Sequence, residues 1–528
     1  MTDPNESTRP TKAKATVEAH ERGVAVLLLL FVTLVYFGTM VPAAWSRALD
    51  ADETFAVWIV RLIPAARLWD ALSAGADSLP PGFYILLKGV ANVFGSGHLP
   101  MRCASIAAFY VFFLSSFWIL RPDTGGPVAV SASALLLLTG AAGFATVARP
   151  YSIMAACFGL AAVTWHRSSA GERPRWRAML IAIPLAVAVF VHFYSVLMAV
   201  SFGLVEAIWA WRNRRLRWEV WGALAAGGCS VLAWLPLIEP IYRNTHSSIN
   251  APGFYAKPSF TAFAQKYLDL VLPAPISLLL LGVLVFLPPC LLGLLRSTGG
   301  VRRTRDTQRD PAADNVYILA VGCLMLPVIT FLFASVITGS LNMRYFIAAP
   351  LGVSLLAGVG MARLPQWNSV SGCVLVVTVV LFCVFSLPAG QDPRLAVLLR
   401  APEALPVLAA EASDFFVLTE SAPHSIRARL VYSGMPGGLQ SPDPEPQLVA
   451  RNWKRLRPDL AVFEAEDFFR RTPEFYVLCT QSPREGMTDW LMRHGGLSVV
   501  DRESGVWLFR ANADGRWSRT APSQSGEW

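Results

Sequence analysis

Long apolar segments recur along this chain, and short stretches rich in arginine separate several of them. The first uncharged segment runs from Gly23 to Trp45 and is longer than the apolar core of a signal peptide. It lacks a clean small-residue cleavage site, so we expect a retained membrane span. Ten further segments approach or exceed the roughly 17 residues that a helix needs to cross a bilayer. They cover residues 100–120, 127–147, 149–166, 178–194, 195–211, 219–239, 270–295, 316–338, 345–362 and 370–387.

The arginine distribution predicts which loops face the cytoplasm. Residues 167–177, 212–217 and 296–309 contain four, four and five arginines. Short cytoplasmic loops of membrane proteins are enriched in Lys and Arg, so we place these three segments inside. Alternating spans then put residues 148–151, 191–195, 240–269 and 339–345, and everything after about residue 388, on the external side.

The apolar segment 81–96 is the one doubtful span. It begins with two prolines and contains Lys88, both of which disfavour a membrane-spanning helix. Counting it as a span would also place the basic N-terminal tail outside. We therefore expect eleven spans, a cytoplasmic tail at 1–22, and one large external loop at 46–99 with short interfacial helices near 53–62 and 81–95.

The composition changes after residue 388, where short apolar stretches alternate with polar ones. FFVLTE, ARLVY, FYVLC, LSVV and VWLFRA are typical of short buried strands, and helical stretches are expected near 445–456 and 484–494. This alternation predicts a small external α/β domain at 389–512, followed by a disordered tail at 513–528. The chain is thus expected to be mainly α-helical, with a polytopic membrane helix bundle at 23–388.

Composition supports this class of protein. The chain is 54% hydrophobic and only 15% charged, whereas soluble domains contain about 25% charged residues. The net charge of +9 comes with arginines clustered in short loops, and no basic stripe interleaved with aromatics lies outside them, so we set nucleic-acid binding aside. Seven of the eight cysteines lie in or beside apolar segments and Cys479 stands alone, which predicts neither a disulfide framework nor a zinc site.

The predicted topology gathers ionisable side chains at the external face. Each alone has a structural explanation, because Arg and Lys near span ends often snorkel to the interface and an isolated histidine is more often hydrogen-bonded filler. Together, cations beside a carboxylate suit a lipid-linked phosphate, since Arg and Lys bind phosphate and an Asp can deprotonate a hydroxyl. The set comprises Asp52, Glu53, Arg61, Arg67, Asp77, Lys88, Arg102, Arg149, His192, Glu239 and Arg344.

Six short motifs follow one another in a recognisable order: the DE pair after the first span, DSLPPGFYILLK, LPMRCAS, ARPYSIMA, VHFYS and MRYFIAAP. Over residues 23–365 this order resembles the GT-C glycosyltransferase superfamily. The nearest branches are the dolichyl-phosphate-mannose-mannosyltransferase-like and aminoarabinose-transferase-like membrane proteins. The resemblance implies a transferase at the outer face of the inner membrane that takes a polyprenyl-phosphate-linked sugar and a lipid, glycan or protein acceptor.

The resemblance also implies roles for individual residues. Asp52 corresponds to the general base, and Glu53 completes the acidic pair. Residues of the first loop, of ARPY, of VHFYS and of the late RY element would bind the substrate. The predicted substrate-binding residues are Asp77, Lys88, Arg102, Arg149, Tyr151, His192, Tyr194, Arg344 and Tyr345.

The chain departs from the family pattern at three places. It reads SLPPGF where many relatives have a His or Lys directly before the proline pair, and MRCAS where they have RLPS. The missing basic residue leaves the phosphate-binding assignment open. YSIMAAC stands where some oligosaccharyl relatives have a metal-binding DxD motif, so we expect no metal or other cofactor, although Asp52 and Asp77 leave room for a divalent ion.

The predicted reaction is an inverting displacement, in which Asp52 removes the acceptor proton and basic residues stabilise the departing polyprenyl phosphate. Three alternatives stay open at this stage. A transporter or flippase of a lipid-linked glycan would have many spans, but it predicts ionisable residues near span midpoints. Asp52 could instead be a solvated anchor at the membrane surface, and the C-terminal domain could be a non-catalytic scaffold.

Cysteine labelling tests the predicted topology. Single cysteines at positions 75 and 440, in a background without native cysteines, should both react with a membrane-impermeant reagent applied from outside. The reason is that the arginine-rich loops place both positions on the opposite side from the cytoplasm. Protection of position 440 would contradict the count of eleven spans.

Overall fold

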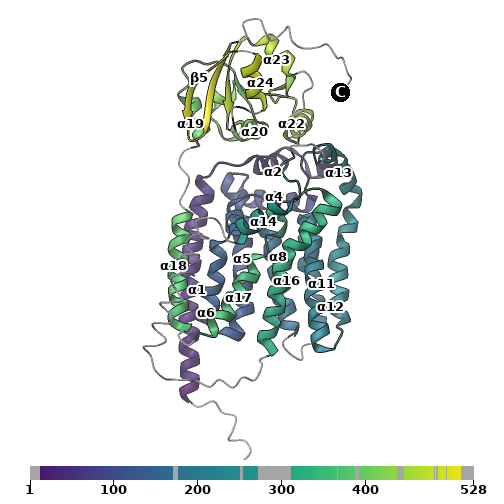
Figure 1. The fold of residues 1–528 in the computed structure, drawn as a ribbon, viewed down its shortest axis with the longest axis vertical. Coiled ribbons are helices and arrows are strands. Elements are labelled where there is room, and N and C mark those ends of the chain that lie inside the picture. The colour runs from purple at the N-terminus through teal and green to yellow at the C-terminus, as the bar shows by residue number, and fades with distance from the viewer. Residues whose placement is uncertain are drawn as a thin grey trace, which may run out of the picture.

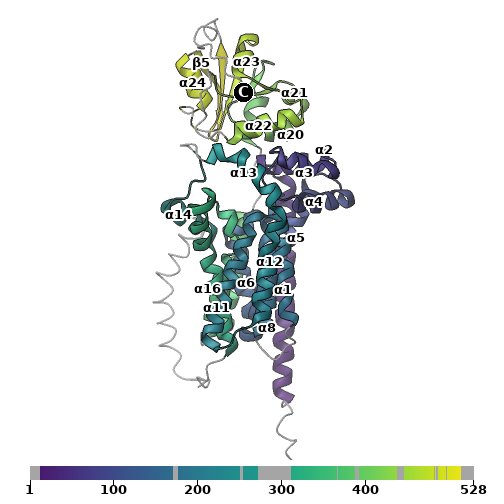
Figure 2. The same cartoon turned by 90° about the vertical axis from the view of Figure 1, so that its right-hand side faces the viewer.

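A computed structural model describes residues 12–169, 176–249, 254–271, 311–364, 367–386, 392–436, 445–480, 482, 484, 486–494 and 496–512. Long helices run side by side in a bundle, and a smaller domain with a β-sheet lies at one end of it (Figures 1 and 2). A layer of short helices lies between the two (Figure 1). The expected combination of a helical membrane bundle and a small C-terminal α/β region is confirmed.

Apolar sequence explains the bundle, because inside a bilayer the backbone polar groups must be satisfied within the helix itself. Among the described residues, five helices are long and apolar enough to cross a membrane, and a bent pair at residues 126–146 makes six. Gly125, with φ of 85°, ends one of them, and the next begins at Gly126. The bundle helices are α1 (Lys12–Ser46), α5 (His98–Thr124), α6 (Gly126–Ala134), α8 (Tyr151–Ser169), α10 (Ala182–Val191), α11 (Val196–Asn213), α12 (Trp218–Cys229), α16 (Pro311–Phe333), α17 (Pro350–Ala362) and α18 (Trp367–Phe385).

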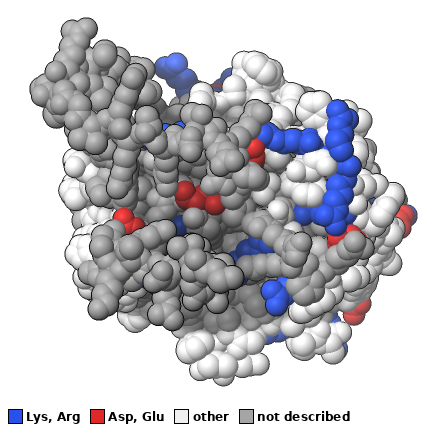
Figure 3. Space-filling model, turned by 90° about the horizontal axis from the view of Figure 1, so that it is seen from below, with Lys and Arg blue, Asp and Glu red and all other residues white. Residues whose placement is uncertain are grey.

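Shorter apolar helices account for several of the remaining predicted spans, at Trp176–Val191, Pro350–Ala362 and Ser369–Phe385. The predicted span at 270–295 lies outside the described residues after Val271, as does the arginine-rich segment 296–309. The end of the bundle opposite the sheet exposes Lys and Arg side chains (Figure 3). Arg212 at the end of α11, and Arg214 and Arg215 between α11 and α12, are exposed. The count of eleven spans and the orientation stay predictions.

The segment after α1 folds into short helices that lie across the top of the bundle (Figures 1 and 2). They are α2 (Ala51–Leu62), α3 (Leu68–Ser73) and α4 (Pro81–Phe94). Asp50 starts α2 through a capping box with Glu53, in which each side chain accepts a hydrogen bond from the other residue's backbone N–H. The short helices expected near 53–62 and 81–95 are present as α2 and α4. Further helices at the same end are α13 (Leu235–Ile249) and α14 (Phe260–Val271).

The C-terminal sheet has six strands in the order β3-β2-β1-β4-β6-β5. The first four in this order are parallel, and β6 is antiparallel to both β4 and β5. The strands are β1 (Val407–Ala409), β2 (Leu430–Ser433), β3 (Val462–Phe463), β4 (Glu474–Cys479), β5 (Gly496–Glu503) and β6 (Val506–Asn512). Its helices include α19 (Pro393–Leu399), α20 (Ala412–Ser421), α22 (Glu445–Leu456), α23 (Ala465–Arg471) and α24 (Gly486–His494). The predicted tail at 513–528 lies outside the described residues.

One strand prediction was wrong. The stretch FFVLTE lies inside helix α20 instead of forming a strand. Its apolar residues are buried on two sides, because Phe415 packs against Tyr432 of the sheet and Phe416 packs against Phe55 of α2. A short apolar run that is buried all round has no periodicity that separates a strand from a helix. The other four stretches contain or overlap strands β2, β4, β5 and β6.

Candidate active site

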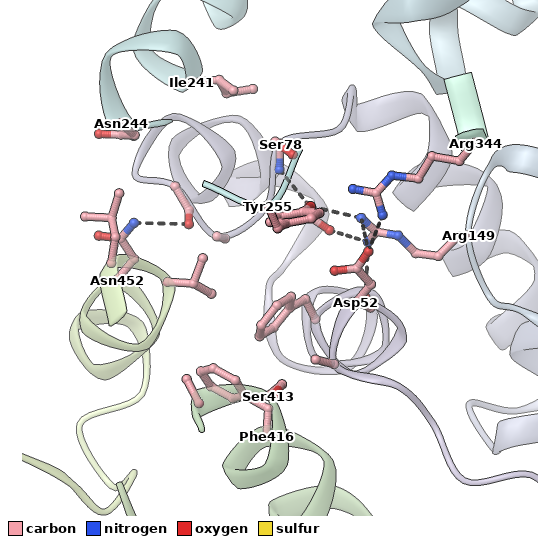
Figure 4. Close-up of a pocket in the computed structure, with 18 residues that line it drawn as sticks. Asp52, Ser78, Arg149, Ile241, Asn244, Tyr255, Arg344, Ser413, Phe416 and Asn452 are labelled. Carbon is pink, nitrogen blue, oxygen red and sulfur yellow. Dashed lines mark hydrogen bonds and ion pairs between the residues drawn. The ribbon is translucent and has the colours of Figure 1, made fainter. Parts of the chain in front are cut away.

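A cavity of about 210 Å³ lies where the first-loop helices meet the sheet domain (Figure 4). The N-terminal turn of α2 and the turn at residues 75–78 form one side of it. Helices α20 and α22 of the sheet domain form another side, and Arg344 comes from the turn η8 (Met343–Phe346). Its polar lining includes Asp52, Asp77, Ser78, Arg149, Asn244, Tyr255, Arg344, Ser413 and Asn452.

Asp52 presents its carboxylate to two arginines. Arg344 donates a hydrogen bond of 2.7 Å to Oδ2 of Asp52, and a terminal nitrogen of Arg149 lies 4.0 Å from the same oxygen. Arg149 also donates to the backbone carbonyl of Asp52 at 3.1 Å. Burial opposes ionisation, but Arg149 and Arg344 outweigh it and hold the pKa of Asp52 below its usual value. The Asp52 side chain is still 40% exposed, so an ionised carboxylate faces the cavity.

Asp77 fixes the position of Arg149. Both oxygens of the Asp77 carboxylate accept hydrogen bonds from the terminal nitrogens of Arg149. Tyr84 of α4 donates to Oδ2 of Asp77 at 2.6 Å, and the backbone N–H of Ser78 donates to Oδ1 at 2.7 Å. A bidentate pair of this kind fixes the orientation of the guanidinium as well as its distance. Asp77 and Arg149, two predicted site residues 72 positions apart, are thereby brought together beside Asp52.

Glu53 turns away from Asp52 into the protein interior. Arg102 donates two hydrogen bonds to its carboxylate, at 2.7 and 2.6 Å, and Arg47 donates a third at 3.1 Å. The backbone N–H of Ala148 donates to Oε1 of Glu53 at 2.6 Å. Glu53 and Arg102 are both fully buried. The two members of the acidic pair therefore have different surroundings, and Glu53 has its oxygens occupied by protein donors.

Arg102 and Lys88, two predicted substrate-binding residues, also donate their hydrogen bonds to protein groups. Besides Glu53, Arg102 donates to the carbonyls of Ala44, Arg47 and Ala48 at the end of α1. Lys88 donates to the carbonyls of Val60 and Ile63 at 2.8 and 2.6 Å and so caps the C-terminus of α2. Both cations support the backbone around the cavity, and neither belongs to its lining.

The predicted site residues Tyr151, His192, Tyr194 and Tyr345 form one cluster of rings next to Arg344. Tyr194 stacks on Tyr345 with ring centroids 3.9 Å apart, and His192 lies 5.6 Å from Tyr345 and 5.8 Å from Tyr151. The Arg344 guanidinium lies 5.4 Å from the Tyr151 ring, within range of a cation–π contact. Burial, with Arg344 and Arg149 adding to it, lowers the pKa of His192 to about 3, so this imidazole is neutral at pH 7.

Several cavity residues have no counterpart in the sequence prediction. Ser413, Phe416 and Asn452 come from the sheet domain, and Asn244 comes from α13. Nothing in their local sequence marks them, because they become neighbours of Asp52 only through packing between distant segments. Within the described part of the chain, no group of three or more His, Cys, Asp or Glu residues could hold a metal ion. The expectation about cofactors stays a prediction.

Comparison with known proteins supports the fold. No protein-family model and no curated protein matches this sequence. The crystal structure of apo ArnT from Cupriavidus metallidurans is similar over 95% of this chain and 99% of that chain, with a TM-score of 0.53 and 16% identity. The structure of that ArnT bound to undecaprenyl phosphate has the same coverage and TM-score, with 15% identity. An oligosaccharyltransferase from Archaeoglobus fulgidus covers 92% of this chain and 74% of its own length, with a TM-score of 0.43 and 9% identity.

The chain therefore has the GT-C fold, the fold of a class of membrane glycosyltransferases. The likeness to ArnT, an aminoarabinose transferase, extends over both the bundle and the sheet domain because almost the whole of each chain is covered. The resemblance inferred from the six motifs is confirmed at the level of the fold.

Glu53 and Asp52 should respond differently to loss of charge. Glu53→Gln leaves Arg102 buried without a counter-charge, and breaking a buried ion pair in this way costs roughly 3–5 kcal/mol. We expect a large drop in the unfolding temperature of the purified protein in detergent. Glu239→Gln is the matched control, because Glu239 pairs with Arg243 on the surface and exposed pairs contribute little. Equal unfolding temperatures for the two variants would contradict a structural role for Glu53.

Proposed function

We propose that this protein is an integral-membrane glycosyltransferase that transfers a sugar from a polyprenyl-phosphate-linked donor to an envelope acceptor. The observation that carries this proposal is the convergence of Arg149 and Arg344 on Asp52 inside a cavity. Two arginines can hold the phosphate of the donor, and the carboxylate can take a proton from an acceptor hydroxyl. The binding of undecaprenyl phosphate by ArnT, which has the same fold, supports a donor of this class.

The chemistry is a displacement at the anomeric carbon. A new bond forms between the acceptor oxygen and this carbon while the bond from the carbon to the phosphate oxygen breaks. The electron pair leaves with the polyprenyl phosphate, whose growing negative charge Arg149 and Arg344 stabilise. Asp52 accepts the proton of the acceptor hydroxyl. The attack comes from the side opposite the phosphate, so the configuration of the sugar inverts.

Donor binding also activates the base. Without a donor, Arg344 donates directly to Asp52 and keeps its pKa low, which makes Asp52 a weak base. A donor phosphate would compete for the same guanidinium. As Arg344 turns part of its hydrogen bonding toward phosphate, Asp52 loses charge stabilisation and its pKa rises. The base therefore becomes stronger when the sugar donor is in place.

The remaining partners follow from the position of the cavity. It lies at the end of the bundle that carries the sheet domain, and the arginine-rich loop between α11 and α12 lies at the other end. We place the cavity and the sheet domain outside the cytoplasm, on the external face of the inner membrane, because short arginine-rich loops stay inside. We propose that the acceptor is a lipid, glycan or protein with a free hydroxyl and that the reaction needs no cofactor, with Asp52 and Asp77 the residues that leave room for a divalent ion.

Replacing Asp52 by Asn should abolish transfer with little effect on folding, because the change removes only charge and basicity. Loss of a general base costs about 10²-fold or more in kcat. Asp70→Asn, an exposed residue of α3, serves as the control and should retain activity. Release of free polyprenyl phosphate by the purified protein is the measurement. An Asp52→Asn variant within a few-fold of wild type would remove Asp52 from the mechanism.

The pH profile gives an independent test of the same base. Because Arg149 and Arg344 lower the pKa of Asp52, the free enzyme keeps the active ionised form above that lowered pKa and loses it as pH falls through it. The acid limb of kcat/KM, which reports the free enzyme, should therefore lie below the usual range of an aspartate. In Arg344→Ala the limb should move to higher pH. An unchanged limb would contradict the contact between Arg344 and the base.

Arg344 also distinguishes a transferase from a transporter. Arg344→Ala should weaken binding of a polyprenyl-phosphate sugar and slow its cleavage together, and Arg344→Lys should restore activity only in part because Lys lacks the bidentate fork. The matched control is Arg243→Ala on the surface of α13. Protein reconstituted in liposomes should release polyprenyl phosphate when acceptors are supplied. Movement of labelled lipid between leaflets without this release would favour a transporter or flippase.

A further inference from the structure

Three side chains from two distant helices converge on the backbone that leads into Asp77. Asn244 of α13 donates to the carbonyl of Ser73 at 3.0 Å. From α22 of the sheet domain, Asn452 donates to the carbonyl of Gly75 at 3.3 Å, and the indole N–H of Trp453 donates to the carbonyl of Ala76 at 3.2 Å. These carbonyls stand at or just after the end of α3, where no following helical turn supplies N–H groups to donate to them.

The two asparagine side chains pack closely against the turn at Gly75. Gly75 has φ of 84°, a left-handed conformation that favours glycine. A Cβ atom at this position would lie 2.4 Å from the amide nitrogen of Asn452 and 3.2 Å from that of Asn244. Both asparagines therefore press directly against the turn (Figure 4 shows both beside the cavity). The backbone at residues 73–76 is therefore in direct contact with both α13 and α22.

Trp453 also contacts the helix that carries Asp52. Its ring is fully buried and stacks against Phe55 of α2 with centroids 6.1 Å apart. It meets Trp58 of the same helix edge-on at 5.1 Å. Beside it, Glu420 of α20 accepts a hydrogen bond from the Trp58 indole at 3.0 Å and pairs with Arg61. One indole thus bridges α2 and the turn before Asp77.

We propose that Asn452 and Trp453 of the sheet domain are positioning residues, which set the Asp77–Arg149 pair against Asp52 and make the sheet domain a working part of the active site. This inference rests on the proposed transferase function. The contacts run from α22 to the carbonyls of Gly75 and Ala76, then to the adjacent Asp77, and from Asp77 to Arg149. Arg149 in turn donates to the backbone of Asp52.

Docking of the sheet domain on α2 and the turn at 73–76 would then be needed for catalysis as well as for folding. A displacement of about 1 Å in a site of this kind can reduce turnover roughly 10²-fold without removing a reacting group. Loss of the α22 contacts would let the Asp77 turn move, and Arg149 would move with it. Because Arg149 helps to hold Asp52 ionised, the acid limb of the pH profile would move upward as well.

The experiment compares Asn452→Ala and Trp453→Phe with Trp507→Phe in the full-length protein. Trp507 lies on β6 of the same domain, packs against Phe509 and is not among the residues that line the cavity. The two α22 variants should lower kcat roughly 10- to 100-fold and raise the acid limb, while the Trp507 variant stays near wild type. Asn244→Ala, which acts on the same turn from the bundle, should reproduce the effect without altering the sheet domain.

Two further measurements separate the possible outcomes. Hydrogen–deuterium exchange of the amides at residues 74–78 should speed up in the α22 and Asn244 variants, whether or not an active donor is known. Asp77→Asn combined with Asn452→Ala should cost less than the sum of the two single changes, because both act through Arg149. Unchanged exchange at 74–78, or additive losses, would overturn the positioning role. A wild-type protein that neither binds nor cleaves polyprenyl-phosphate sugars, with exchange still faster in the variants, would refute only the transferase proposal.

Discussion

The buried ion pair between Glu53 and Arg102 joins four segments of the chain beside the cavity: the end of α1, the first turn of α2, α5 and the stretch before Arg149. Arg102 of α5 binds three carbonyls at the end of α1, and Glu53 belongs to the first turn of α2. Glu53 also accepts from the N–H of Ala148, the residue directly before Arg149. A pair with every hydrogen-bonding group occupied can stay charged when fully buried, whereas a lone charge there would be strongly destabilising. Asp52 follows Ala51 and directly precedes Glu53, and Arg149 directly follows Ala148, so both residues lie beside this pair and line the cavity.

Two acidic and two basic side chains line the cavity. Two carboxylates, Asp52 and Asp77, face two guanidinium groups, Arg149 and Arg344, so the four charges nearly cancel. The Arg149–Asp77 pair is bidentate and largely buried. The Arg344–Asp52 pair is more accessible, because the Asp52 side chain is 40% exposed and that of Arg344 is 21% exposed. For the proposed transferase, a donor phosphate would meet one firmly held cation, Arg149, and one that can exchange partners, Arg344. The Arg344 guanidinium also lies over the rings of Tyr151 and Tyr345, at 5.4 and 5.8 Å from their centroids.

The sheet domain closes the cavity instead of standing apart from the membrane bundle. Phe416, Trp453 and Glu420 meet Phe55, Trp58 and Arg61 of α2 in a largely buried contact. Aromatic packing supplies the burial and the paired polar groups give the contact a single register. A domain that acted only as a scaffold would not need to contact the cavity. Helices α20 and α22 of this domain line the same cavity as Asp52.

The sequence by itself determined those features that depend on neighbouring residues. Apolar length predicted the bundle, the proline pair and Lys88 argued for a short helix near 81–95 instead of a span, and the order of motifs singled out Asp52, Asp77, Arg149 and Arg344. Tertiary structure alone decided that Glu53 points away from Asp52, that Lys88 caps α2, and that FFVLTE is a helix packed between the sheet and α2. It also brought Asn452 to the turn before Asp77, across 377 positions. Periodicity and composition depend on whether a segment is exposed to water, to lipid or to the protein interior. The partner of a buried polar group depends on which distant segment packs against it, and no local sequence pattern contains that information.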